Sequence, residues 1–296
     1  MEKLSKKKIK LRNNEELAYV EVGEGNKTIV LIHGNYSSSI HYYPLLTHCP
    51  KGYKMVAIDL RGFGDSTYLN RFNSLDELAL DVIEALDLLN IKQFYLVGWS
   101  LGGGVSLKIS AKIPLRVLKL VLIEGASYRG FPVYQKDGKY QNIVGKVYPS
   151  KEALALDPVL VVPALQAFKA QDKAFFNMIY MATMWNIKRP PEDEVDVYLE
   201  ETMKERCLID ADYALAHFNM SNFSNLYNLG TNDINDVVAP TLVTFATKDL
   251  VVTEKMVMEN LNAIKNAKLI KYEGMGHSLI TDLREDLLKD LVKFFE

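Results

Sequence analysis

The chain has little that would suit it to a membrane, to nucleic acid or to an oxidising compartment. Among its 296 residues, no hydrophobic run approaches the roughly 18 to 20 residues that cross a bilayer, and no apolar signal region follows the lysines near the N-terminus. Its formal net charge is only −2, whereas a nucleic-acid-binding surface needs a concentrated basic face. The sequence therefore predicts a cytoplasmic protein with no membrane span and no nucleic-acid partner.

Cysteine is also scarce. Cys49 and Cys207 lie far apart and lack the spacing of a metal or redox site, so we expect two reduced thiols and no metal centre. There is no internal repeat and no low-complexity tract, and no pattern indicates an oligomeric state. These absences favour an ordinary globular protein, and we expect it to act on a small molecule.

What is present is a large apolar fraction, arranged as strands that alternate with helices. Apolar residues make up 48% of the chain and charged residues 24%, enough for a sizeable core. The expected strands cover residues 8–12, 17–22, 28–32, 55–58, 94–97, 118–123, 241–245 and 269–272. Ser74 and Glu77 predict a capping box at the start of one helix, and residues 281–295 predict a single final helix. Such alternation is typical of an α/β fold with a mostly parallel sheet.

The alternation stops in the middle of the chain. Residues 126–236 have a helical pattern and are rich in aromatic residues and methionine. We therefore expect a core made of residues 1–125 and 237–296, with residues 126–236 inserted as a helical cap or lid. Such an insertion would cover the carboxyl ends of the strands, where open α/β sheets bind their ligands.

One stretch predicts a nucleophile. The apolar run before Gly98 reads as a buried strand, and a helical pattern begins after Ser100, so Gly98-Trp99-Ser100-Leu101-Gly102 matches G-x-S-x-G between a strand and a helix. The glycines allow the tight turn that would expose the Ser100 hydroxyl at the start of the helix.

A serine nucleophile needs a base and an acid. Among five histidines, His277 is the candidate base because it lies in a glycine-containing loop after the last predicted strand. Asp249 follows the strand before it and is the favoured acid, whereas Glu124, at the end of strand 118–123, is the alternative. The order Ser100, Asp249, His277 is that of α/β-hydrolases.

The oxyanion of the reaction needs two backbone N–H donors. Leu101 follows the nucleophile at the start of its helix, and Asn35 lies in the loop after strand 28–32. We expect the amides of these two residues to form the oxyanion hole.

Together these motifs make the chain similar to capped α/β-hydrolase fold proteins. The resemblance rests on H-G-N at 33–35, D-L-R-G-F-G-D-S at 59–66, G-W-S-L-G-G at 98–103, K-D at 248–249 and G-H-S at 276–278. It implies an eight-stranded, mostly parallel sheet flanked by helices, a cap after the sixth strand, a triad of Ser100, Asp249 and His277, and no cofactor. Relatives with aspartate in place of the serine include haloalkane dehalogenases and epoxide hydrolases, and Ser100 argues against both activities.

The leading hypothesis is a serine esterase that forms an acyl-enzyme on Ser100 with a small to medium, fairly apolar carboxylic ester or lactone. Two alternatives keep the fold and triad but change the bond: a carbon–carbon bond hydrolase, or an aminopeptidase resembling the prolyl iminopeptidases. A third is a ligand-binding signalling receptor that retains the triad. The natural substrate and the specificity residues of the expected cap are not indicated by the sequence.

Overall fold

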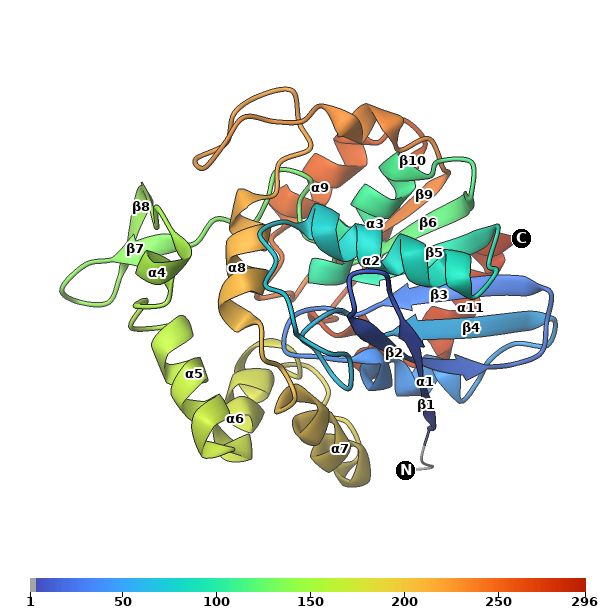
Figure 1. Cartoon of the computed structure of the whole chain (residues 1–296), viewed down its shortest axis with the longest axis horizontal. Helices are drawn as coiled ribbons and strands as arrows, with labels where there is room; N and C mark the ends of the chain where they lie inside the picture. The colour runs from blue at the N-terminus through green and yellow to red at the C-terminus, as the bar shows by residue number, and fades with distance from the viewer. Residues whose placement is uncertain (1–3) are drawn as a thin grey trace.

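The computed structural model describes residues 4–296 and is built around one eight-stranded sheet (Figure 1). The strand order is β1-β2-β4-β3-β5-β6-β9-β10. The strands are β1 (Lys6–Lys10), β2 (Glu16–Val22), β3 (Lys27–Ile32), β4 (Tyr53–Ile58), β5 (Phe94–Trp99), β6 (Val117–Ile123), β9 (Thr241–Ala246) and β10 (Ala267–Tyr272). Strand β2 pairs in antiparallel fashion with both β1 and β4, and all pairs from β4 to β10 are parallel. The predicted α/β fold is confirmed.

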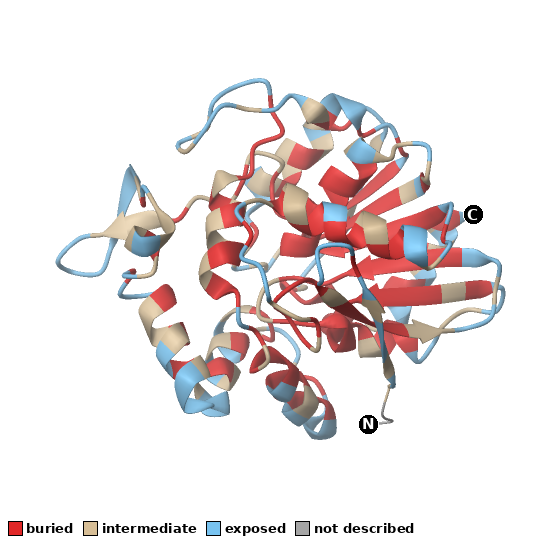
Figure 2. Ribbon diagram, viewed as in Figure 1, coloured by how far each residue is buried: buried red, intermediate tan, exposed pale blue. Residues whose placement is uncertain are grey.

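Helices cover both faces of this sheet, because successive side chains of a strand point to opposite sides. In β3, Val30 and Ile32 pack into one hydrophobic cluster, whereas Ile29 and Leu31 pack into another. The first cluster includes α2 (Leu75–Leu88), α3 (Leu101–Lys112) and α9 (Glu254–Ala263), and the second includes α1 (Tyr43–Leu46), α10 (Leu279–Asp282) and α11 (Glu285–Phe295). The inner strands are accordingly buried along most of their length (Figure 2).

The segment between β6 and β9 folds mainly as helices beside the sheet (Figure 1). Its elements are a hairpin of β7 (Tyr134–Lys136) and β8 (Asn142–Val147), the helices α4 (Lys151–Leu154), α5 (Val161–Ala170), α6 (Lys173–Thr183), α7 (Glu192–Thr202) and α8 (Leu208–His217), and the 3₁₀ helix η2 (Asp233–Asp236). The hairpin was not expected from the sequence. Tyr180 of α6 and Thr202 of α7 both donate hydrogen bonds to the carbonyl of Tyr36, so the segment contacts the loop after β3.

Two local predictions are wrong. The final helix is divided into α10 and α11 because Arg284, with a φ of 53°, interrupts it and directs its guanidinium to both carboxyl oxygens of Glu194, at 2.7 and 2.9 Å. Helix α2 does follow Ser74, but the Ser74 side chain makes no capping hydrogen bond. Glu77 instead accepts a hydrogen bond from the amide of Asn73, at 2.8 Å.

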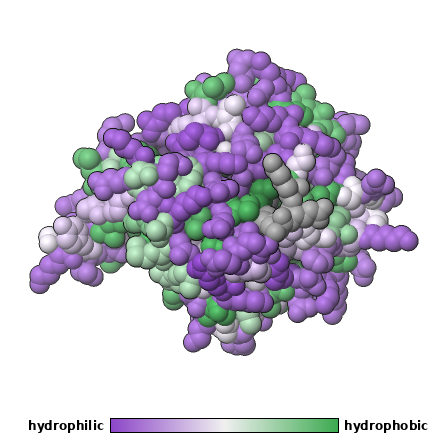
Figure 3. Space-filling model, turned by 90° about the horizontal axis from the view of Figure 1, so that it is seen from below, coloured by the Kyte–Doolittle hydropathy of each residue, from purple (hydrophilic) through white to green (hydrophobic). Residues whose placement is uncertain are grey.

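The face seen from below in Figure 3 is mainly hydrophilic, with apolar residues in smaller patches. None of the helices within residues 4–296 combines the length and the apolar character that crossing a membrane requires.

Candidate active site

Ser100 occupies a strained turn between β5 and α3. Its φ of 56° and ψ of −121° lie outside the usual regions for a residue with a side chain. The turn is tight enough that a Cβ atom on Gly98 would collide with the carbonyl of Gly102, and one on Gly102 would collide with the carbonyl of Ile32. Glycine at both positions is therefore what allows this turn to pack against β3.

The loop after β3 passes directly over Ser100. A Cβ atom on Gly34 would lie 2.8 Å from Cβ of Ser100. This close approach brings the next residue, Asn35, beside the serine, and both residues line one cavity. His33 supports the loop from beneath, with Nδ1 2.8 Å from the Gly34 carbonyl and Nε2 accepting the amide of Leu60 at 3.0 Å.

The structure brings His277 and Asp249 together. Nδ1 of His277 lies 2.8 Å from Oδ2 of Asp249, and both side chains are fully buried. The other carboxyl oxygen of Asp249 accepts the amides of Val251 and Val252, at 2.6 and 2.9 Å. Burial by itself would raise the pKa of Asp249, but His277 and these two amides hold that pKa below its ordinary value. An ionised Asp249 thus faces the imidazole.

His277 and Ser100 line the same cavity. Nε2 of His277 is buried and has no hydrogen-bond partner within residues 4–296, so the Ser100–His277 hydrogen bond is not formed in this structure. Such bonds are often long in free enzymes and tighten when substrate binds. The backbone of His277 is also held, because Nε1 of Trp99 donates to its carbonyl at 3.0 Å.

Glu124, the alternative acid, has a different environment. It is fully buried with a φ of 43°, and its carboxyl oxygens accept from the Thr244 hydroxyl at 2.6 Å and the Ala246 amide at 3.2 Å. Burial raises the pKa of Glu124 well above its ordinary value, and the neighbouring charge of Asp249 raises it further. The imidazole of His277 is thus hydrogen-bonded to Asp249. Glu124 lies beside Asp249 and is hydrogen-bonded to residues of β9.

The two backbone amides that we expect to form the oxyanion hole are not used in hydrogen bonds within the described protein. Within residues 4–296, the amides of Asn35 and Leu101 donate to no protein acceptor, whereas the next amide in the loop, that of Tyr36, donates to Glu205 at 3.0 Å. Leu101 is the first residue of α3, so its amide also benefits from the positive end of the helix dipole.

The cavity around Ser100 has a volume of about 290 Å³ and is mainly apolar. Apart from Ser100, His277 and Asn35, its lining includes Tyr36, Leu101, Ala126, Phe131, Val133, Val159, Leu160, Ala164, Phe175, Phe176, Ile179, Tyr180, Thr183, Met184, Asp212, Leu215, Val251 and Val252. Most of these residues come from the segment between β6 and β9. The aromatic and methionine-rich stretch of the sequence therefore contributes directly to the cavity.

Sequence reasoning missed one charged residue of this cavity, Asp212 of α8. Its Oδ1 accepts a hydrogen bond from the side chain of Asn35 at 3.0 Å. Burial raises the pKa of Asp212 to about 7, although the Asn35 hydrogen bond acts in the opposite direction. No motif surrounds Asp212, and it is 177 positions from Asn35, so nothing in the sequence marked it.

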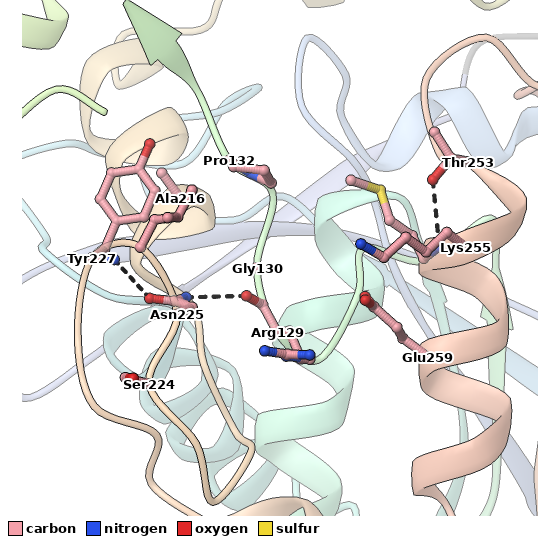
Figure 4. Close-up of a pocket in the computed structure, with 12 residues that line it drawn as sticks. Arg129, Gly130, Pro132, Ala216, Ser224, Asn225, Tyr227, Thr253, Lys255 and Glu259 are labelled. Carbon is pink, nitrogen blue, oxygen red and sulfur yellow. Dashed lines mark hydrogen bonds between the residues drawn. The ribbon is translucent and has the colours of Figure 1, made fainter. Parts of the chain in front are cut away.

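A second cavity, of about 380 Å³, is lined in part by Arg129, Gly130 and Pro132 (Figure 4). It is lined by residues such as Arg129, Tyr227 and Lys255, and Asn225 donates to the Arg129 carbonyl across it. It contains none of Ser100, Asp249 and His277, so the smaller cavity is the candidate active site. Within residues 4–296, no group of three or more His, Cys, Asp or Glu side chains is arranged to hold a metal ion.

Comparison with known proteins agrees with this architecture. The model of the α/β hydrolase fold family matches residues 27–282. A curated relative, the (E)-2-((N-methylformamido)methylene)succinate hydrolase of Acinetobacter baylyi, is 25% identical over 271 residues, which cover 92% of this chain and 90% of that protein.

Solved structures share the fold across nearly the whole chain. The enol-lactonase from Burkholderia xenovorans superposes with a TM-score of 0.70 at 19% identity, covering 95% of this chain and 97% of the other. An esterase from Exiguobacterium antarcticum superposes with a TM-score of 0.69 at 20% identity, covering 97% and 98%. The geometry around Ser100 therefore lies within a fold that these proteins share.

Proposed function

Because the chain belongs to the α/β-hydrolase fold family, we propose that it is a serine hydrolase that cleaves a small to medium, fairly apolar carboxylic ester or lactone. The observation that carries this proposal is the arrangement of His277. Its Nδ1 is bound to Asp249, and it lines the same cavity as Ser100, which lies on the strained turn before α3. This is the arrangement that a base needs in order to activate a serine hydroxyl.

The reaction then follows in two steps. Ser100 Oγ attacks the substrate carbonyl while Nε2 of His277 takes its proton, and Asp249 stabilises the imidazolium. The amides of Asn35 and Leu101 bind the oxyanion, which collapses to an acyl-enzyme as His277 returns the proton to the leaving alcohol. His277 next takes a proton from a water molecule as the water oxygen attacks the acyl carbon. The bond between the acyl carbon and Ser100 Oγ then breaks, which releases the acid, and His277 returns the proton to Ser100.

The cavity supports the choice of substrate class. Its volume of about 290 Å³ is near the lower end of the ~300 to 1,000 Å³ typical of ligand pockets, and its lining is mainly apolar. Its lining residues within the described chain include no lysine or arginine, which a carbon–carbon bond hydrolase would use to hold a substrate carboxylate. An acyl group without a carboxylate fits these surroundings better. The two solved structures that share the fold, an esterase and an enol-lactonase, agree with ester or lactone hydrolysis.

Hydrolysis of p-nitrophenyl esters from acetate upward tests the proposal. We expect rapid turnover by the wild type and a loss of kcat of about 10⁴- to 10⁶-fold in Ser100→Ala, because the nucleophile is removed. Ser110→Ala is the matched control. Ser110 is a buried serine of α3, the helix that follows Ser100, and its hydroxyl has no hydrogen-bond partner within residues 4–296. The chain length at which the rate falls would measure the usable cavity.

Two outcomes would contradict the proposal. Turnover that persists in Ser100→Ala would show that Ser100 is not the nucleophile. Very slow turnover by the wild type, together with ligand-dependent binding of another protein, would instead favour a signalling receptor that retains the three residues.

A further inference from the structure

Asp212 places a carboxyl group inside the mainly apolar cavity that contains Ser100. It belongs to α8 and is half-buried, and it lines the cavity together with Ser100 and His277. Its Oδ1 accepts the Asn35 hydrogen bond, and within residues 4–296 its Oδ2 has no recorded partner. Oδ2 is not one of the fully buried polar atoms that lack a hydrogen-bond partner, so it is accessible to solvent. The open oxygen of Asp212 is thus available to a bound molecule.

No positive side chain compensates this group. The cavity lining within the described residues contains neither lysine nor arginine. The ionisable groups whose charges interact with Asp212 are Tyr36, Glu205, Cys207 and Asp157, and Asn35 is its hydrogen-bond donor. Two of the four are carboxylic acids, and a protonated tyrosine, thiol or amide carries no positive charge. An ionised Asp212 therefore gives the cavity a negative charge that no lysine or arginine of the described lining balances.

The neighbouring acids have partners of their own. Asp157 accepts the hydroxyl of Tyr148 at 2.7 Å and lies 3.4 Å from the ammonium of Lys136. Glu205 accepts the Tyr36 amide, and burial raises the pKa of Glu205 well above its ordinary value, which disfavours its charged form. Asp212 is consequently the acid whose negative charge faces the cavity.

We propose that the Asp212 carboxylate binds a protonated amine carried by the substrate, while Ser100 attacks the substrate's carbonyl. This inference rests on the proposed serine hydrolase function and adds a chemical class to it: an ester or lactone with an apolar chain that ends in, or carries, an ammonium group. A charged donor in so poorly hydrated a site gains a strong hydrogen bond to a carboxylate. A substrate carboxylate at the same place would be repelled.

The test compares esters that differ only in the terminal group. p-Nitrophenyl 3-aminopropanoate, 6-aminohexanoate and 8-aminooctanoate are paired with the alkyl esters of equal length, butanoate, heptanoate and nonanoate. The corresponding ω-hydroxy esters supply a neutral hydrogen-bond donor. We expect the wild type to prefer the ammonium ester at one of these lengths.

Asp212→Asn is the informative variant, because asparagine keeps the size of the side chain and an oxygen that can accept from Asn35 but removes the charge. We expect it to lower the ratio of kcat/KM for the ammonium ester over the alkyl ester by about 10- to 100-fold, mainly through KM. Asp196→Asn, which changes an exposed acid of α7, is the control and should leave the ratio unchanged. The wild-type ratio should also rise between pH 6 and pH 8, as Asp212 ionises with its pKa of about 7.

Binding without turnover separates this inference from the proposed function. Titration of Ser100→Ala protein with n-hexylamine by calorimetry should show saturable binding that Asp212→Asn weakens by a similar factor. Equal ratios in wild type and Asp212→Asn at every chain length, or an equal preference for the hydroxy esters, would overturn the inference while leaving the hydrolase proposal intact. If the wild type hydrolysed none of the esters but still bound the amine through Asp212, the hydrolase proposal alone would be overturned.

Discussion

At the scale of single residues, the clearest contrast is between two buried carboxyl groups that end neighbouring strands. Asp249 follows β9, binds His277 and accepts two amides, which favour its ionised form. Glu124 follows β6 and is held by Thr244 and Ala246. Burial and the charge of Asp249 raise the pKa of Glu124, whereas the partners of Asp249 lower the pKa of Asp249, so ionisation of the neighbouring pair is favoured at Asp249.

This difference predicts opposite results for two isosteric substitutions. Asp249→Asn should lower kcat for a p-nitrophenyl ester by about 10⁴-fold, because an amide can no longer stabilise the imidazolium of His277. Glu124→Gln should keep kcat within about tenfold of the wild type, because the hydrogen bond of His277 is made to Asp249, which this change leaves in place. Steady-state kinetics of both variants decides between the two acids. A larger loss in Glu124→Gln than in Asp249→Asn would reverse the assignment.

At the scale of elements, the candidate site depends on the junction of β3, β5 and α3. Gly102, in the first turn of α3, packs against the carbonyl groups of Ile32 and His33 at the end of β3. The same contact holds the loop that carries Asn35 close to Ser100. The position of the expected oxyanion donors is therefore set by how closely one helix approaches one strand.

Gly102→Ala should therefore destabilise the fold by about 1 to 3 kcal/mol, because the added methyl group forces α3 away from β3. Gly138→Ala is a matched control, since a Cβ atom there would meet no atom within 4 Å. We expect that change to stay within about 0.5 kcal/mol of the wild type. Urea unfolding followed by circular dichroism measures both, and equal midpoints for the two variants would contradict the close packing inferred at Gly102.

At the scale of the whole molecule, residues 126–236 make buried polar contacts with the loop between β4 and α2. Asp210 of α8 is one of them: it accepts Nε of Arg71 at 3.0 Å and the hydroxyl of Tyr68 at 2.5 Å, and it pairs with Lys151 at 2.9 Å. Burial would raise the pKa of Asp210, but these partners lower that pKa below its ordinary value of 3.8. The division into a core and a separate cap remains a prediction, and this contact would lie between its two parts.

The lowered pKa has a defined effect on stability. A carboxyl group whose pKa is lower in the folded protein stabilises the fold above its unfolded pKa and loses this contribution as the pH falls through its folded pKa. We expect Asp210→Asn to destabilise the protein by about 2 to 4 kcal/mol at pH 7, because Lys151 and Arg71 lose their buried partner. The difference from the wild type should shrink below about pH 3.8. A difference that is the same at pH 7 and pH 3 would contradict this origin.

Much of the fold could be predicted because its signals are local. The β-branched runs at residues 28–32 and 118–123 indicate buried strands, and the glycines around Ser100 indicate a turn between a strand and a helix. The division of the last helix at Arg284 could not be predicted, because Arg284 has a positive φ there and pairs with Glu194 of α7, a residue distant in the sequence. The hairpin of β7 and β8 was missed because its strands are short and lie in a segment whose overall pattern is helical.

The sequence by itself determined the α/β architecture, the turn that carries Ser100 and the loops that carry Asn35, Asp249 and His277, because turn chemistry and hydrophobic periodicity act between residues close together in the chain. Only the tertiary structure decided which carboxyl group contacts His277 and which charge faces the cavity. Asp212 meets Asn35 across 177 positions, and such a contact depends on how separate elements pack, which no short stretch of sequence encodes.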